Sequence, residues 1–529
     1  MTWFSLPALR ADKAPQFADK AGCDAWLAGK PLANAPLMQG ELADQLETLN
    51  TWGIPPRERY KILDTLRKVV FAVETDSVKR YEFRPLPLTA VEQKTFDASC
   101  RLWRELATGY LHCLRAALDG DAGVSDLATK ICHRTITCLR LEQLSRYRGG
   151  SAIPASWWRL LHAVQASAEE LRADATPVSD RTFAETREST VSAHFAMAVL
   201  LHLARPFELS RSQFAAAVRW LARWREQAGV YDHVAEVQNT RSVCVDLASD
   251  DPIHLASGAP AKPRWIALDS VLGKLKRRAK ALREGQTPEE LRLGSGLPTD
   301  ACIALLQFLH GAFQNPPQTI NTSRERKREV GLAGTVEAVH RLLGGTPVND
   351  EPEPNAISNR RIHEQIAIFG HVPKQNTAPD PTAGLTEWNV LAENATDLML
   401  RRLPGAADTR LAARSLIALY DAKARATTLG IIRYLSTQED GSLIAMVRTV
   451  TGDGRPFLAV GREKVTNRIL NFPAVFLPAV GHINHPATVF LPDGSTSKLV
   501  RLDIADLPEG LKVGALLDRG ANFERMRCE

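Results

Sequence analysis

The amino-acid sequence predicts a multidomain α+β protein, in which a large all-α region is followed by a β-rich region. A chain of 529 residues is too long for one compact unit and favours two to four domains. Through the first 312 residues, apolar side chains recur at helical spacing, and nine of the ten tryptophans lie there. After that point, short apolar runs alternate with turn residues, which is typical of antiparallel strands. We therefore expect an all-α helical domain at 1–312.

Two local signals mark the starts of helices in this first part. Pro55 and Pro56 pre-set a first turn ahead of an apolar stripe that begins at Ile62. Thr89 and Glu92 have the spacing of a capping box before a second, longer stripe. Further helices are expected at about 124–147, 155–174, 188–204 and 210–228.

The β-rich region has short strands at regular intervals. They are expected at about 388–391, 398–401, 415–420, 430–435 and 443–448. This spacing favours an antiparallel barrel or sandwich. We assign 313–465 to a barrel with an insertion at 331–385, and expect 449–457 to close it. Residues 466–529 are a C-terminal β-rich extension, either a separate unit or extra strands of the barrel. A small β insertion is also expected in the helical domain, at 240–268.

The composition excludes several classes of protein. The 66 basic and 60 acidic side chains give a net charge of +6, which permits an anionic ligand without requiring one. No apolar run approaches the ~20 residues that cross a bilayer, and the first residues do not resemble a secretory signal. The eight cysteines form no CxxC pair and lie mostly in apolar patterns. We therefore expect reduced core thiols and a cytoplasmic protein.

The motifs of common enzymes are missing from the sequence. It contains no GxSxG nucleophile elbow, no GxxxxGK[ST] phosphate loop and no GxGxxG dinucleotide motif. The zinc-protease motif HExxH is incomplete. We therefore expect no enzyme activity, no catalytic residue, no metal ion and no cofactor.

A dense run of arginines precedes the β-rich region. Arg324, Arg326 and Arg328 lie in the segment RERKR, and Arg324 and Arg328 have RxxxR spacing. The planar guanidinium group binds phosphate oxygens, or the O6 and N7 edge of guanine, through two parallel hydrogen bonds. Charge runs are usually solvated surface, so the run by itself is a weak sign of a ligand site.

A second pattern, about 65 residues further on, strengthens this interpretation. Trp388 leads a strand that meets the polar turn Asn394-Ala-Thr396, and the strands at 415–420 and 430–435 follow. Together with RxxxR, this order of parts resembles the PilZ domain. PilZ domains are bacterial six-stranded barrels that bind cyclic di-GMP through an N-terminal RxxxR and a later [DN]xSxxG. The resemblance covers about 315–460 and implies a cyclic di-GMP receptor.

The resemblance also assigns ligand-binding residues. Arg324 and Arg328 match the two arginines of RxxxR, and Arg326 lies between them. Asn394 matches the first residue of [DN]xSxxG, and Thr396 stands where the family has serine. Its hydroxyl group still donates and accepts hydrogen bonds.

The sequence departs from the family pattern at the end of the second motif. Met399 replaces the glycine that allows the backbone to approach the ligand, so its thioether would obstruct a guanine base. Arg360 and Arg361, in a Pro-rich loop of the insertion, offer substitute guanidinium groups for the same ligand.

Three functional hypotheses follow from these patterns. In the first, a cytoplasmic bacterial signalling protein binds cyclic di-GMP in its barrel and relays the signal to an unidentified protein partner through the helical domain. In the second, the same fold is an interaction scaffold without the nucleotide, which Met399 favours. In the third, the protein binds nucleic acid through the basic segments 273–283 and 324–328. No aromatic residue interleaves these charges, which disfavours the third hypothesis.

Overall fold

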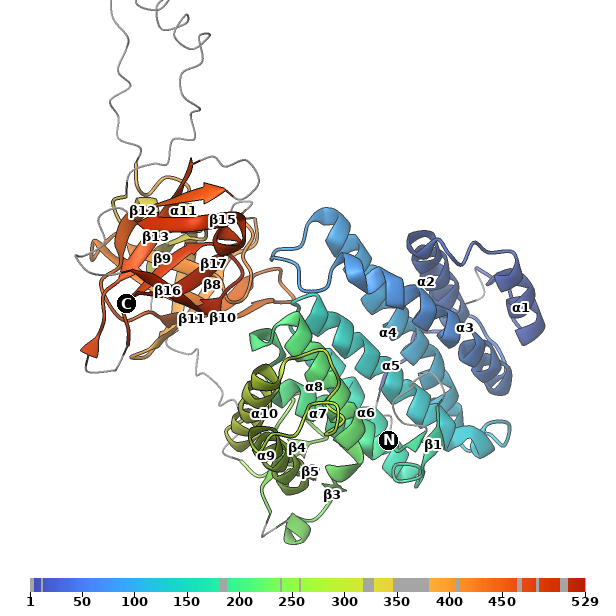
Figure 1. Ribbon diagram of the computed structural model, residues 1–529. Helices are drawn as coiled ribbons and strands as arrows, with labels where there is room; N and C mark the ends of the chain where they lie inside the picture. Colours follow the sequence, from blue (N-terminus) through green and yellow to red (C-terminus); the bar gives the residue numbers. More distant parts are fainter. Residues whose placement is uncertain are drawn as a thin grey trace, which may run out of the picture. The chain divides into compact units, whose positions relative to one another are not determined.

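The computed structural model describes residues 4–10, 13–180, 188–237, 240–255, 258–316, 328–345, 380–405, 409–463, 469–481, 485–504 and 512–528. The chain divides into two compact units (Figure 1). Unit 1 comprises Met1–Arg84 and Leu88–Ile320, and unit 2 comprises Pro85–Pro87 and Asn321–Glu529. Helices dominate unit 1, whereas unit 2 contains a closed barrel and further strands, so the predicted α+β class is confirmed.

Unit 1 is built from helices around a large apolar core, and it contains a smaller apolar cluster of Tyr81, Phe96 and Cys100. The helices are α1 (Lys20–Ala28), α2 (Ala35–Thr51), α3 (Pro56–Ser77), α4 (Ala90–Leu118), α5 (Ala128–Arg148), α6 (Ala155–Glu170), α7 (Val191–Leu203), α8 (Arg211–Trp224), α9 (Asp269–Arg283) and α10 (Thr299–Gln314). Every residue of α5 from Ile131 to Ser145 is buried, so α5 is the central helix of the unit.

The helix starts follow the local signals in the sequence. Helix α3 begins at Pro56, directly after Pro55. At the start of α4, the Thr89 hydroxyl accepts the N–H of Glu92, and the Glu92 carboxylate accepts the N–H of Thr89. The predicted capping box is therefore confirmed, and it satisfies two N–H groups that the helix itself cannot.

Unit 1 also contains two small antiparallel sheets. Strands β1 (Val178–Ser179) and β2 (Glu188–Ser189) form a hairpin. Strands β3 (Val230–Tyr231), β4 (Ser242–Asp246) and β5 (Pro263–Ala267) form a sheet with the order β3-β5-β4. This sheet lies where the sequence suggested a small β insertion.

The first part of unit 2 is a closed barrel with the strand order β10-β11-β8-β7-β6-β9, and all its pairings are antiparallel. Its strands are β6 (Glu329–Ala333), β7 (Thr386–Glu393), β8 (Asp397–Arg402), β9 (Leu416–Asp421), β10 (Ala426–Thr437) and β11 (Leu443–Thr449). Closure leaves no strand of this sheet with an unpaired edge.

The strand that closes the barrel is not the one that the sequence suggested. Residues 449–457 were expected in this position, and 331–385 were expected as an insertion. Instead, β6 pairs with both β7 and β9 and completes the ring. Strand β12 (Arg455–Glu463) pairs with β13 and β15 in a second sheet, so its hydrogen bonds are made there.

The second sheet has the order β15-β12-β13-β14-β17-β16. Its other strands are β13 (Ile469–Leu477), β14 (Thr488–Pro492), β15 (Leu499–Ile504), β16 (Val513–Arg519) and β17 (Phe523–Cys528), and α13 (Ser495–Lys498) precedes β15. Helix α11 (Val336–Leu342) contributes Val336 and Val339 to a core that contains residues of both sheets. The amide of Asn522 further joins them, donating to the carbonyls of Gly334 and Leu416 at 3.0 Å each. The C-terminal strands therefore form a second sheet packed against the barrel.

Two further features of the described residues are the length of the apolar helix segments and the state of the cysteines. None of the helices within them has an apolar stretch long enough to cross a bilayer. All eight cysteines are free thiols, and all except Cys244 are buried, as the sequence predicted.

Candidate functional site

Strand pairing in the barrel brings the two halves of the sequence pattern together. Arg328 immediately precedes β6, and β6 pairs with β7 so that Glu329 lies opposite Asn389. The N–H of Val390 donates to the carbonyl of Arg328 at 2.9 Å. Residues about 65 positions apart thus become neighbours at one end of the barrel, where β7 turns into β8.

Two carboxylates hold the Arg328 guanidinium at this end. Its Nε donates to Asp421 at 2.8 Å, and its Nη1 donates to Glu393 at 2.7 Å. Burial alone would lower the pKa of Arg328, but the hydrogen bond with Asp421 and the charge of Glu393 outweigh burial and raise it. The backbone N–H of Ala424 and the Arg328 guanidinium hold the pKa of Asp421 below its usual range. Arg328 is therefore a positioned cation rather than a free surface side chain.

The turn between β7 and β8 is organised by Asn394. Its side-chain oxygen accepts the N–H of Thr396 at 2.9 Å and the N–H of Asp397 at 2.8 Å. Asparagine favours such turns because its short amide can replace a backbone acceptor. The carbonyl of Thr396 in turn accepts the N–H of Thr449 at 2.8 Å, which ties the turn to the end of β11. Asn394 and Thr396 are both exposed at this end of the barrel.

Asp397 joins the turn to the neighbouring strand. Its carboxylate accepts from the Thr396 hydroxyl at 2.8 Å and from Arg448 Nε at 3.1 Å. Burial alone would raise the pKa of Asp397, but these two hydrogen bonds outweigh it and lower the pKa. The described end of the barrel therefore presents Arg328, which two carboxylates hold, and Arg448, which one carboxylate holds.

Met399 lies on the outer face of the barrel. Side chains alternate along β8, and its neighbours Leu398 and Leu400 are buried while Met399 is partly exposed. Its partner across the β8–β11 pair is Met446, which is also partly exposed. The two thioethers therefore form an apolar patch on the strand that leaves the Asn394 turn.

Trp388 is a core residue. Its side chain is fully buried, and its indole Nε1 donates to the Thr386 hydroxyl at 3.0 Å. The Arg402 guanidinium lies 5.5 Å from the centre of the ring. The indole is therefore used for packing and offers no face on which a base can stack.

The structure brings together three of the residues that the sequence proposed, namely Arg328, Asn394 and Thr396. Arg324, Arg326, Arg360 and Arg361 lie outside the described residues. The acidic and basic partners of this site were not predicted from the sequence. They are Glu393, Asp397, Asp421 and Arg448. Glu393 directly precedes Asn394, so its position in the sequence was a usable signal, whereas the pairing of Asp421 with Arg328 depends on the barrel.

The described residues thus define a protein with a helical unit and a closed antiparallel barrel whose end carries this charged site. A family model described as "Cyclic-di-GMP receptor FimW, N-terminal domain" matches residues 20–233. The match runs from α1 past β3, so it lies on the helical unit and not on the barrel, where the sequence resemblance had been placed. Comparison with curated proteins and with solved structures gave no match.

Proposed function

We propose that this protein is a bacterial cyclic di-GMP receptor without catalytic activity, in which the barrel of unit 2 binds the nucleotide as a PilZ-like domain. The observation that carries the proposal is the placement of Arg328 beside the Asn394–Asp397 turn. The family match of the helical unit to a cyclic di-GMP receptor supports the same ligand independently. The eight free thiols are typical of the reducing cytoplasm, where we place the protein.

The chemistry of the site suits a phosphodiester that carries guanine bases. Two carboxylates position Arg328 through Nε and Nη1, and its Nη2 has no hydrogen-bond partner among the described residues. A partly exposed ion pair contributes only about 0–1 kcal/mol, so an anionic ligand can replace Glu393 at small cost. Arg324 and Arg326 would add further positive charge from the preceding segment.

The proposed signal passes from the barrel to the helical unit and then to a protein partner. Contacts between the phosphate groups of the nucleotide and the arginines would start this signal, because phosphate-bearing ligands commonly switch proteins between two states.

Calorimetric titration of cyclic di-GMP into the full-length chain tests the proposal. We expect micromolar or tighter binding, no response to GMP, and a roughly tenfold to hundredfold loss of affinity in Arg328→Ala, since one bidentate arginine contact contributes about 1–3 kcal/mol. The double variant Arg324→Ala/Arg328→Ala should lose more.

Arg401→Ala is the matched control for this titration. Arg401 is a barrel arginine that is ion-paired with Asp440, and its exposure is similar to that of Arg328. Its replacement should leave affinity unchanged. No heat and no thermal shift with wild-type protein at ligand excess would refute the proposal, as would an equal loss of affinity in Arg401→Ala.

A second candidate function is a protein-interaction scaffold without nucleotide binding. The paired Met399 and Met446 on the outer face favour it, because flexible thioether surfaces suit adaptable protein contacts. In the same titration, Met399→Gly distinguishes the two functions. A gain of affinity in this variant means that the thioether obstructs a competent site, whereas absence of binding in both proteins favours the scaffold.

A further inference from the structure

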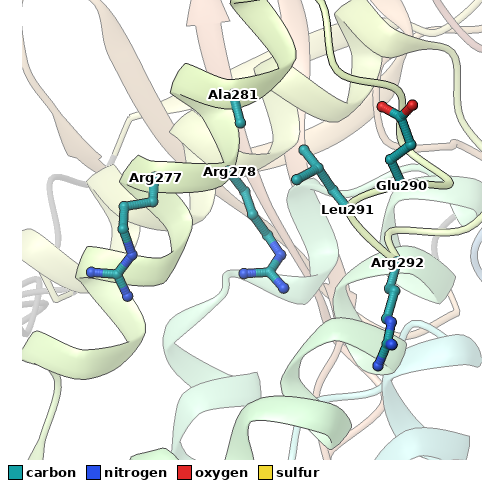
Figure 2. Close-up of a pocket in the computed structure, with 6 residues that line it drawn as sticks. All are labelled: Arg277, Arg278, Ala281, Glu290, Leu291 and Arg292. Atoms are coloured by element: carbon teal, nitrogen blue, oxygen red, sulfur yellow. The ribbon is translucent and has the colours of Figure 1, made fainter.

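Five cationic side chains gather on one surface of unit 1. We call them the arginine cluster, and they are Arg223 of α8, Lys274, Arg277 and Arg278 of α9, and Arg292 of the loop that follows α9. The ammonium group of Lys274 and the guanidinium group of Arg278 lie 5.7 and 5.1 Å from the ring centre of Trp224. Arg277, Arg278 and Arg292 line a common pocket (Figure 2).

The positive charges on α9 do not stabilise the helix itself. Its apolar face, including Leu275 and Ala279, is buried in the core, and the cations lie on the remaining surface. Lys274 and Arg278 are four residues apart, and like charges at this spacing destabilise a helix. A Cβ atom at Gly273 would lie 3.1 Å from Nη1 of Arg277, so the glycine gives this guanidinium room beside the helix.

The loop after α9 is held in place by α8. The indole of Trp220 donates to the carbonyl of Leu293 at 2.9 Å, and the guanidinium of Arg223 donates to the carbonyl of Arg292. Arg292 has a φ of 56°, in the left-handed region that residues other than glycine seldom adopt. Backbone strain of this kind persists only where surrounding contacts impose it, and it is concentrated at functional sites. The contacts of Trp220 and Arg223 with this loop therefore fix the backbone position of Arg292.

The cluster lacks counter-charges within the described part of the chain. Among the described residues, no carboxylate forms an ion pair with any of the five cations. Glu290 also lines the pocket, but its carboxylate points to the opposite side from the three guanidinium groups (Figure 2). The Nε of Arg278 is buried without a hydrogen-bond partner among these residues. Burial, and then the charges of Arg277 and Arg223, lower the pKa of Arg278. The site is thus electrostatically suited to an anion.

We propose that the arginine cluster binds a phosphate-bearing small molecule, whose phosphate groups contact Arg277, Arg278 and Arg292. Guanidinium groups bind phosphate oxygens through paired hydrogen bonds. The pocket has a volume of about 390 Å³, within the usual range of small-molecule sites. Trp220 and Trp224 are buried, so the site offers no aromatic surface for stacked bases, which disfavours single-stranded nucleic acid.

Titration of pyrophosphate into the full-length chain tests this proposal, with sodium chloride at matched ionic strength as the reference. We expect saturable binding and a rise in melting temperature. In Arg277→Gln/Arg278→Gln, the affinity for pyrophosphate should fall at least tenfold, and the rise in melting temperature should be smaller. The matched control is Lys280→Gln/Arg283→Gln, which removes the same charge from exposed positions of the same helix and should bind like wild type.

Further arms identify the source of the phosphate. In a chain that also carries Arg328→Ala, cyclic di-GMP binding that is lost with Arg277→Gln/Arg278→Gln would assign the phosphate to that nucleotide. If this chain binds pyrophosphate but not cyclic di-GMP, the natural ligand of the site is a different phosphate-bearing molecule. Either result supports the site, and neither depends on the function proposed for the barrel.

Three results would overturn the proposal. One is an equal loss of pyrophosphate binding in the control variant, and another is a response that does not saturate. The third is preferential binding of an oligonucleotide with a steep salt dependence, which would make the surface a nucleic-acid contact. The anion-free melting temperature of Arg277→Gln alone gives a separate check. Arg277 is exposed and its charge repels Arg278, so its removal should not lower the melting temperature, whereas removal of a structural arginine would.

Discussion

At the residue scale, Asn394 has a structural role that was not predicted from the sequence. Its side-chain oxygen is engaged by two backbone N–H groups, so it shapes the turn on which Thr396 and Asp397 are presented. Arg328 differs, because its partners are carboxylates that an anionic ligand can replace. Arg328 is therefore a better probe of binding than Asn394, since replacement of Asn394 would also disturb the turn at the end of the barrel.

Glu74, in α3, provides a prediction at the same scale. Burial raises its pKa to about 7 from an ordinary 4.5, although Gln39 donates a hydrogen bond to it at 2.7 Å. The native carboxyl group stays protonated where the unfolded chain ionises, so stability falls as the pH rises from about 4.5 to about 7. Glu74→Gln should therefore be more stable than wild type at pH 8, by about 3 kcal/mol at most, and should gain little at pH 4.

Thermal unfolding of both proteins at pH 4 and pH 8 measures this difference. Glu58→Gln is the control, because the backbone N–H of Lys20 and the ammonium group of Lys61 lower the pKa of Glu58. Its replacement should give no gain at pH 8. If the wild-type protein were more stable than Glu74→Gln at pH 8, this result would contradict the raised pKa of Glu74.

At the scale of elements, a buried ion-pair network connects the β1–β2 hairpin to α3 and α5. Asp180 follows β1 directly and accepts from Arg67 of α3 at 2.9 and 3.0 Å and from Arg134 of α5 at 2.6 Å. All three residues are buried. The hairpin thus supplies the buried carboxylate for two arginines, which otherwise have, among the described carboxylates, only the partly exposed Asp64 of α3, 3.9 Å from Arg67 and 3.2 Å from Arg134.

Asp180→Ala should strongly destabilise unit 1. Removing one partner from a buried ion pair costs about 3–5 kcal/mol, because the remaining charges lose their compensation. The denaturant dependence of the unit 1 transition measures this loss. Asp126→Ala serves as the control, since Asp126 pairs with Arg57 at an exposed position and its removal should cost less than about 1 kcal/mol. Equal effects of the two substitutions would contradict the network's structural role.

At the scale of the whole molecule, the two units have separate apolar cores. The core of unit 1 extends from Phe4 to Phe313, whereas the cores of unit 2 involve the barrel, α11 and the second sheet. Units with their own cores commonly unfold in separate steps. We therefore predict two calorimetric transitions for the full-length chain.

Ligands should move these two transitions separately. Cyclic di-GMP at 100 times its Kd should stabilise unit 2 by about 2.7 kcal/mol, and pyrophosphate should shift the unit 1 transition. Differential scanning calorimetry measures both, with Arg328→Ala as the control, whose shift with the same concentration of cyclic di-GMP should be smaller because its affinity is lower. A single transition that either ligand shifts would mean that the two units unfold together.

Much of the helical architecture was predictable from sequence, because its signals are local. The capping box of Thr89 and Glu92 and the proline start of α3 each involve residues within one turn of the helix. The strands β7 to β11 were predictable for a similar reason, as each is a short apolar run between turn residues. For the candidate site, the sequence indicated Arg328, Asn394 and Thr396, but not the carboxylates that hold Arg328.

The sequence alone predicts the α+β class, several of the helices, the strands β7 to β11, the reduced thiols and the polar turn at Asn394. The tertiary structure decided that β6 closes the barrel, that Asp421 pairs with Arg328, and that Arg223 lies beside Arg292. The physical reason is the range of the interactions. Periodicity and capping act between residues a few positions apart, whereas strand pairing and ion pairs join residues tens of positions apart, which only the folded chain brings together.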